Sequence, residues 1–324
     1  PERERIMKIA MIGSGAAGSV FAAYLKKGGA DMYLVDRYQA HMDQIAANVL
    51  TFVSPAGEEQ LTGFHTAPTA ENIGTMDIVI LMVKATQTDN VMPSVLPCIG
   101  PDTVLVSLQN GLGNDEILSK YLPEDRILCG FGTIGTELPQ PGKCVSKPES
   151  GIVMHFGASQ KSEKNDKAGQ YLQETFIKGG CEARYEENVK PFIWKKAISN
   201  SGYNTLSALT RIKVGPLIAD DFGQDLMWQV WKEGCAVAQA DGAGDLWPEM
   251  QAEMPRLAAG FSTYYPSMAQ DAVLHQRQTE ISVLNGAIVK YGKKYGIPTP
   301  VNSVLTSLVS CIQNNYDCQY KANT

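Results

Sequence analysis

A short apolar run that stops in a cluster of glycines is the feature that most constrains this chain. Lys8–Ile12 reads KIAMI, and the next six residues, GSGAAG, place glycine at positions 13, 15 and 18. The segment 16–27 has helical composition and ends at Gly28-Gly29, a pair typical of a helix C-cap. The pattern predicts a buried strand, a tight glycine turn and a helix, in that order.

The spacing Gly13-x-Gly15-x-x-Gly18 between a strand and a helix is the context of the dinucleotide-binding fingerprint. The first glycine permits the tight turn, the second lets a pyrophosphate approach the backbone, and the third lets the helix pack against the strand. The helix N-terminus offers N–H groups and a partial positive charge to the phosphates. A glycine-rich turn without a ligand is the alternative. We expect the cofactor to be bound by Gly13, Ser14, Gly15, Ala16, Ala17 and Gly18.

An acidic residue closes the second predicted strand, 31–36. Asp36 lies 23 positions after Gly13, where an acid usually accepts hydrogen bonds from the adenosine ribose and repels a 2′-phosphate. Asp36 therefore favours NADH over NADPH. Arg37 follows at once and is suited to hold a 2′-phosphate instead. An ordinary acidic turn residue is the remaining interpretation of Asp36.

Strand-like and helix-like segments alternate through the first half of the chain, which favours a parallel sheet with right-handed crossovers. Further strands are predicted at 77–83, 103–108, 126–129 and 152–156. We expect a loop over 142–150 and a charged surface turn over 161–167. The expected class is α/β, with a Rossmann-type doubly wound parallel sheet over residues 1–188.

Helical patterns dominate the second half, at 191–209, 224–240 and 267–295, so we expect an all-helical domain over residues 189–324. This domain could present a face for a homodimer. Residues 1–6 precede MKIAMIG, which resembles a natural start at Met7, and we expect them to be an extension.

Composition excludes several classes of protein. The net charge of -6 gives no general attraction to nucleic acid or to an anionic membrane. The seven cysteines are dispersed and form no C-x-x-C pair, which favours reduced thiols and a cytoplasmic location. The four histidines lack metal-ligand spacing, so no metal site is expected. No apolar stretch is long enough to span a bilayer.

Polar residues recur where a second binding surface could form. Lys84 and Asn110 each follow a predicted strand, and strand carboxyl ends line the ligand crevice of open α/β sheets. Lys196, Asn200 and Asn204 are four apart, so they share one face of the helix 191–209. The alternative for Lys84 is a solvated lysine at a strand end, and the alternative for Asn110 is a turn. The alternative for the three residues of the helix is a solvated face. Asparagine is a poor helix former, which favours a polar cavity.

Five motifs, taken together, resemble the ketopantoate reductase (2-dehydropantoate 2-reductase) family from Met7 to about residue 312. They are IGSGAAGS, MVKATQT, QNGLGN, WKKAISNSGYNTLSAL, and SMAQD with RQTEISVLNG followed by GIPTPVN. The resemblance implies hydride transfer from NAD(P)H to a 2-oxo acid, with ketopantoate becoming D-pantoate in pantothenate biosynthesis. NADPH is the cofactor implied by the family.

The resemblance also implies roles for individual residues. Lys196 would be the general acid, and Glu280 would hold the substrate hydroxyl and orient that lysine. Substrate binding would fall to Asn200, Asn204 and Ser267, whereas Lys84 and Asn110 would place cofactor and substrate at the nicotinamide end.

Two positions depart from the family pattern. Tyr264 stands three residues before Ser267, where many members carry asparagine, and Asp36 stands where members that use NADPH prefer a basic or neutral residue. These departures bear on substrate and cofactor. A D-2-hydroxyacid dehydrogenase acting on branched or aromatic 2-oxo acids is therefore a second hypothesis. A non-catalytic dinucleotide-binding sensor is a third.

Overall fold

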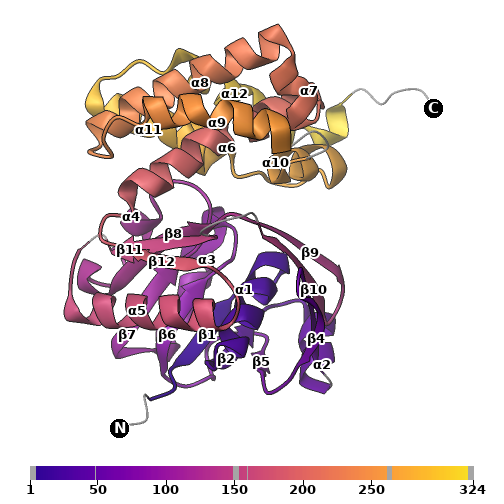
Figure 1. The fold of residues 1–324 in the computed structure, drawn as a ribbon, viewed down its shortest axis with the longest axis vertical. Coiled ribbons are helices and arrows are strands. Elements are labelled where there is room, and N and C mark those ends of the chain that lie inside the picture. The colour runs from indigo at the N-terminus through magenta and orange to yellow at the C-terminus, as the bar shows by residue number, and fades with distance from the viewer. Residues whose placement is uncertain (1–4, 48, 149–152, 159, 261–264, 320–324) are drawn as a thin grey trace. The chain divides into compact units, whose positions relative to one another are not determined.

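The computed structural model describes residues 5–47, 49–148, 153–158, 160–260 and 265–319 (Figure 1). Tyr264 and residues 1–4 of the expected extension lie outside the described residues. The chain forms two compact units, Pro1–Gln109 with Asn114–Val189, and Asn110–Gly113 with Lys190–Thr324. This division differs from the expected one because the short stretch 110–113 groups with the helical unit and Val189 with the first unit.

The first unit is built on an eight-stranded sheet, whose order is β12-β11-β8-β7-β6-β1-β2-β5. Buried apolar runs such as IAMI in β1 and IVIL in β6 are typical of strands covered on both faces. The bounds are β1 Lys8–Ile12, β2 Asp31–Val35, β5 His65–Ala67, β6 Met76–Leu81, β7 Ile99–Ser107, β8 Ile127–Gly132, β11 Met154–Ala158 and β12 Ala183–Glu186.

The predicted fold class is confirmed, but the sheet is mixed rather than wholly parallel. Strand β11 pairs antiparallel with β8, whereas every other strand pair in this sheet is parallel. A parallel pair needs a long crossover connection. Between β8 and β11 the chain forms β9 (Ile134–Gln140) and β10 (Lys143–Pro148), which pair antiparallel with each other, and β11 then runs opposite to β8.

Helices of the first unit pack on this sheet, and α1 contacts α5 through an edge-to-face pair of Phe21 and Phe176 whose ring centroids lie 6.4 Å apart. The bounds are α1 Ala16–Lys27, α2 Gln39–Ala47, α3 Thr88–Val95, α4 Asn114–Leu118 and α5 Glu163–Lys178, with short 3-10 turns at Ala85–Gln87, Leu96–Cys98 and Glu124–Arg126. The predicted surface turn over 161–167 is wrong, because α5 begins there. Ser162 caps this helix by accepting from the Asn165 N–H at 3.0 Å.

A second, four-stranded sheet has the order β4-β3-β10-β9. Its strands are β3 Leu50–Ser54, β4 Gly57–Leu61, β9 Ile134–Gln140 and β10 Lys143–Pro148. The loop predicted over 142–150 is wrong, since Lys143–Pro148 forms β10 between β9 and β3; residues 149–152 lie outside the described part. The cause is long-range pairing: Cys144 and Ser146 alternate toward the buried face, but neither is a strong strand signal by itself.

The second unit is helical, as predicted. Its bounds are α6 Lys190–Thr210, α7 Val214–Ala219, α8 Asp221–Ala240, α9 Trp247–Gly260, α10 Ser267–Ala269, α11 Asn285–Tyr295 and α12 Pro300–Gln313, with a π-helical turn at Gln270–Leu274 and 3-10 turns at Ile281–Val283 and Tyr316–Cys318. In the part of the chain that the structure describes, no helix has the length and apolar character to cross a bilayer.

The continuous helix predicted over 267–295 is wrong. The π-helical turn ends at Leu274, and Gln276 follows with a φ of 48°, in the left-handed region. The Arg277 N–H donates to the Asp271 carbonyl at 3.0 Å, and the Arg277 side chain donates to the Asp271 carboxylate at 2.6 Å. These contacts satisfy the polar groups that the helix break would otherwise leave unpaired.

A buried polar network joins four helices of the second unit. Asn285 on α11 accepts from Thr205 on α6 at 2.6 Å and donates to Asn302 on α12 at 3.0 Å. Asn302 in turn donates to the Glu233 carboxylate on α8 at 2.7 Å. Fully paired networks of this kind specify how helices pack, because each lost partner leaves a buried polar group unsatisfied.

Candidate functional site

The glycine loop between β1 and α1 is shaped by contacts that exclude larger residues. Gly13 has a φ of 92°, and a Cβ there would lie 2.6 Å from the backbone nitrogen of Val83. A Cβ on Gly18 would lie 2.0 Å from the Gly13 carbonyl oxygen. Both glycines are therefore required by backbone conformation and by the close approach of α1 to the strand end.

Gly15 differs from these two glycines, because a Cβ there would meet no described atom within 4 Å. It is the exposed N-cap of α1, where no described side chain forms a capping hydrogen bond and the first turn carries no acid. Ala16 and Ala17 follow with small, half-buried side chains. The space above Gly15 and the uncapped N–H groups fit a pyrophosphate, which is the group that the sequence pattern predicts here.

Buried hydroxyl and imidazole groups support this loop from behind. Ser14 is buried, and its carbonyl accepts from the Ser19 hydroxyl at 2.7 Å. The Ser19 oxygen lies 2.9 Å from Nε2 of His41, a histidine with no exposed surface. The sequence analysis missed His41, and no local pattern could have found it, because its partners Ser19 and Gly142 lie 22 and 101 residues away.

Asp36 directly follows β2 and is half-buried, whereas Arg37 is exposed. The Asp36 carboxylate accepts from the Tyr38 N–H at 2.8 Å, which forms a local turn. The Asp36 N–H donates to the Ala67 carbonyl at 3.2 Å, so the residue is held at the end of the sheet. The geometry satisfies both the ribose-binding interpretation and the turn interpretation.

Four parallel strands end side by side. Ile12 of β1 is in register with Val35 of β2 and with Leu81 of β6, and Leu81 is in register with Ser107 of β7. The residues that follow these ends therefore share one edge of the sheet. The prediction that Lys84 and Asn110 follow strand ends agrees with this edge for Lys84, which comes after β6. Lys84 is half-buried and precedes the 3-10 turn Ala85–Gln87.

Gln109 joins two of these strand ends, although the sequence analysis gave it no role. Its side-chain amide donates to the Val83 carbonyl at 2.7 Å and to the Thr88 hydroxyl at 3.0 Å, and accepts from Ser107 at 2.8 Å. The motif QNGLGN drew attention to this segment of the sequence. It did not indicate that Gln109, and not only Asn110, forms contacts there. Asn110, the next residue, is half-buried and belongs to the second unit.

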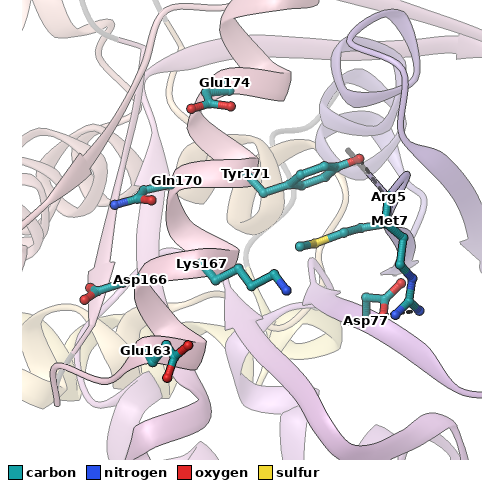
Figure 2. A pocket seen from close by; sticks show the side chains of 9 residues that line it. All are labelled: Arg5, Met7, Asp77, Glu163, Asp166, Lys167, Gln170, Tyr171 and Glu174. Atoms are coloured by element: carbon teal, nitrogen blue, oxygen red, sulfur yellow. Dashed lines mark hydrogen bonds and ion pairs between the residues drawn. The ribbon is translucent and has the colours of Figure 1, made fainter. Parts of the chain in front are cut away.

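A pocket of about 620 Å³ opens at the other end of these strands (Figure 2). Met7 precedes β1 and Asp77 lies near the start of β6, so the pocket is at the amino ends. Ligands of open α/β sheets bind beyond the carboxyl ends, and we assign this pocket no role in catalysis. Its lining is charged and includes an ion pair, with Arg5 2.9 Å from Asp77; the residues are Arg5, Met7, Asp77, Glu163, Asp166, Lys167, Gln170, Tyr171 and Glu174.

The helical unit carries the predicted polar stripe on α6. Asn200 and Asn204 are 6% and 5% exposed, and Lys196 is half-buried. The Asn200 amide oxygen accepts from the Tyr203 hydroxyl at 2.6 Å. Oδ1 of Asn204 is buried and has no hydrogen-bond partner among the residues that the structure describes. A buried amide oxygen normally has a donor, so this position fits one supplied by a ligand.

Three other predicted residues belong to the second unit, namely Ser267, Glu280 and Asn110. Ser267 is exposed at the start of α10, and α10 contacts α6 through Met268, whose sulfur accepts from Thr205 at 3.5 Å. Glu280 is half-buried and precedes the turn Ile281–Val283. The Leu112 N–H donates to the Val283 carbonyl at 2.9 Å, which places the segment of Asn110 beside this turn.

Comparison with known proteins identifies the family. Residues 9–158 match the family described as Ketopantoate reductase PanE/ApbA, and residues 188–313 match its C-terminal counterpart. A 2-dehydropantoate 2-reductase of Streptococcus pyogenes serotype M6 is 30% identical over 303 residues, which cover 94% of this chain and 97% of that protein. The chain belongs to the ketopantoate reductase family. The resemblance carried by the five motifs is thereby confirmed.

Solved structures agree with this ketopantoate reductase assignment. D-mandelate dehydrogenase in a ternary structure with NADH and anilino(oxo)acetate is 28% identical, with a TM-score of 0.86, over 97% of this chain and 100% of that one. A 2-dehydropantoate 2-reductase from Geobacter metallireducens is 26% identical, with a TM-score of 0.85, over 94% and 99% of the two chains. The fold is therefore shared by a D-mandelate dehydrogenase and a 2-dehydropantoate 2-reductase.

Proposed function

We propose that this oxidoreductase reduces 2-dehydropantoate to D-pantoate with NAD(P)H. The observation that carries the proposal is the stripe on α6, with half-buried Lys196 and buried Asn200 and Asn204, in a chain whose two halves match both parts of the family. The named activity of the streptococcal relative supports this substrate. A non-catalytic sensor would need no lysine aligned with two buried asparagines.

Lys196 is the general acid of the proposed reaction. A bound dinucleotide would supply a hydride, that is one proton with two electrons, to the carbonyl carbon. Negative charge then develops on the carbonyl oxygen, where the Lys196 ammonium stabilises it and gives up one proton to form the hydroxyl. Glu280 orients that ammonium and holds the substrate hydroxyl.

Substrate binding follows from the hydrogen-bonding groups of the second unit. The substrate 2-dehydropantoate carries a primary hydroxyl and a carboxylate. The hydroxyl donates one hydrogen bond, which the unpaired Oδ1 of Asn204 shares with the Glu280 carboxylate. The Ser267 hydroxyl donates to the carboxylate, and Asn200 supports the same stripe through its bond to Tyr203. Asn110 and Lys84 place substrate and cofactor at the nicotinamide end.

The two leading substrate hypotheses are separated by a panel of 2-oxo acids followed through oxidation of NADH and of NADPH. We expect the largest kcat/KM with 2-dehydropantoate. If 2-oxoisovalerate or phenylglyoxylate turns over far faster, the protein is a D-2-hydroxyacid dehydrogenase, as D-mandelate dehydrogenase is among its structural neighbours. Cofactor binding without any turnover would favour the sensor.

Asp36 favours NADH in this proposal, because its carboxylate stands at the end of β2 where it would bind ribose and repel a 2′-phosphate. Replacing Asp36 by alanine removes both effects. We expect the ratio of kcat/KM for NADH to that for NADPH to fall by about tenfold, the value of one hydrogen bond to a charged group. The variant Arg37→Ala, at the exposed neighbour, is the matched control and lowers NADPH use if that residue holds the phosphate. An unchanged ratio in Asp36→Ala leaves Asp36 as a turn residue.

A homodimer and a cytoplasmic location complete the proposal. The seven cysteines are all unbonded, which supports a reducing compartment. Light scattering at micromolar concentration measures the oligomeric state directly.

A further inference from the structure

His41 is held at both ring nitrogens although it has no part in the proposed reaction chemistry. It is 0% exposed at the start of α2. The Gly142 N–H, in the turn between β9 and β10, donates to Nδ1 at 2.8 Å. A backbone N–H can only donate, so Nδ1 carries the lone pair and the ring proton is on Nε2.

The proton on Nε2 determines which group donates in the hydrogen bond between His41 and Ser19. The Ser19 hydroxyl lies 2.9 Å from Nε2 and donates its own proton to the Ser14 carbonyl at 2.7 Å. Ser19 therefore accepts from His41. The relay runs from Gly142 through His41 and Ser19 to Ser14, the residue between the first two glycines of the fingerprint. We call these four residues the loop relay.

The surroundings of His41 favour the uncharged ring. Burial lowers the pKa of His41, and the Asp36 carboxylate at the end of β2 opposes this shift less strongly. Tyr38 stacks on the ring with centroids 6.0 Å apart. The ammonium of Lys143, next to Gly142 in β10, is bound to Glu58 at 2.8 Å. A charged ring carries a proton on Nδ1 as well. That N–H would face the Gly142 N–H, and the hydrogen bond between Gly142 and His41 would be lost.

We propose that His41 is a positioning residue for dinucleotide binding: as the Nε2–H tautomer it fixes the glycine loop through Ser19 in the shape that receives the pyrophosphate. The inference rests on the dinucleotide cofactor of the proposed function and not on the identity of the substrate. The side chains of Ser14, Ser19 and His41 are all buried, so the predicted contact of Ser14 with the cofactor would be made by its backbone and not by its hydroxyl. Their effect is on the backbone around Gly15, where the cofactor phosphates would lie.

Removal of the Ser19 hydroxyl tests the relay. We expect Ser19→Ala to raise the Kd for NADH, measured by calorimetry, by about fivefold, the value of one ordinary hydrogen bond. The kcat at saturating NADH should stay within about twofold, because the loop holds the cofactor and does not take part in proton transfer. This split between affinity and turnover is not expected of a general loss of folded protein.

The matched control is Ser146→Ala. Ser146 is also buried in the first unit, and the variant loses a side-chain hydrogen bond of 2.7 Å, to the Tyr24 hydroxyl, whose partner is not a residue of the glycine loop. Its Kd for NADH should equal that of the wild type. An unchanged Kd in Ser19→Ala, or an equal rise in both variants, overturns the proposal. If the wild type binds NADH but does not reduce 2-dehydropantoate, the proposed substrate fails and the positioning role does not.

Nitrogen NMR of the ring tests the tautomer without any ligand. With ¹⁵N-histidine labelling, the spectrum at pH 7 contains signals from four histidines. The His41 signal is assigned by its loss in His41→Gln or, if that variant does not fold, by elimination with His65→Gln, His155→Gln and His275→Gln. We expect one protonated nitrogen, Nε2, and one bare nitrogen, Nδ1. A charged ring or a proton on Nδ1 refutes the relay.

Discussion

At the scale of single residues, a substitution at Lys196 gives the most direct test of the proposed chemistry. It lies one turn before Asn200 on α6 and is half-buried. Removing its ammonium in Lys196→Ala removes the proton donor and the charge that stabilises the developing alkoxide. We expect kcat to fall by at least about a hundredfold while the Kd for NADH stays unchanged, measured by steady-state kinetics and by calorimetry.

The neighbouring lysine provides the control. Lys195 is on the same helix, and its ammonium is paired with Glu249 at 3.2 Å. Exposed ion pairs of this kind contribute little to stability, so Lys195→Ala should keep nearly full activity. Equal turnover in Lys196→Ala and the wild type would remove Lys196 from the mechanism.

At the scale of secondary-structure elements, the packing of α6, α11 and α12 depends on Asn285. This side chain is fully buried, accepts from Thr205, and donates to the Ser201 carbonyl and to Asn302, at 3.0 Å in both cases. In Asn285→Ala these partners stay buried without their hydrogen bonds. We expect the free energy of unfolding to fall by about 1–3 kcal/mol in urea titrations.

Asn315→Ala is the comparison for that experiment. Asn315 is exposed and donates one hydrogen bond, to the Cys311 carbonyl at 2.9 Å. Its removal should change the unfolding free energy by less than about 0.5 kcal/mol. If both variants lose the same stability, the network adds no more than a surface hydrogen bond.

Elements with a strong local signal could be predicted from the sequence, and elements that depend on distant partners could not. Runs such as IVIL in β6 mark a buried strand without reference to other segments. By contrast, β10 pairs with β3 across about ninety residues and has no apolar run of its own. The helix break at Gln276 has a different cause, because Arg277 pairs with Asp271 only six residues earlier and the helical pattern of the segment hides this pairing.

The candidate site likewise contains features with a local sequence pattern and features that depend on contacts between distant residues. The glycine spacing and the stripe on α6 are local patterns of fixed period, and both were visible in the sequence. The supporting contacts are not local. His41 and Gln109 act through partners that only the folded chain brings near them, and a single sequence contains no periodic signal for such contacts.

At the scale of the whole molecule, the seven cysteines report on the folding of both units. Cys98, Cys129, Cys144, Cys181 and Cys235 are buried, and Cys311 and Cys318 are exposed. Burial raises the pKa of Cys98 to about 11 and the pKa values of Cys144, Cys181 and Cys235 to about 12, and it raises that of Cys129 well above its usual range. At pH 8 these five groups therefore remain thiols, and the thiolate is the reactive form.

We expect an aromatic disulfide reagent at pH 8 to modify two thiols of the native protein quickly, and all seven after unfolding in urea. Four of the protected thiols lie in the first unit and one, Cys235, in the second, so their order of exposure shows which unit opens first. Rapid reaction of more than two thiols in the native state would contradict the burial described above.

The placement of Asn110–Gly113 in the helical unit constrains how this protein can be dissected. A Cβ on Gly111 would lie 2.6 Å from the Val283 side chain, so the fit of this segment against the turn that follows Glu280 is close. An expression fragment that begins at Lys190 would lack these four residues and leave the surface of Val283 bare. A chimaera of two relatives should therefore take residues 110–113 and the C-terminal half from the same parent. A single junction near Lys190 would separate these two segments, which belong to one compact unit.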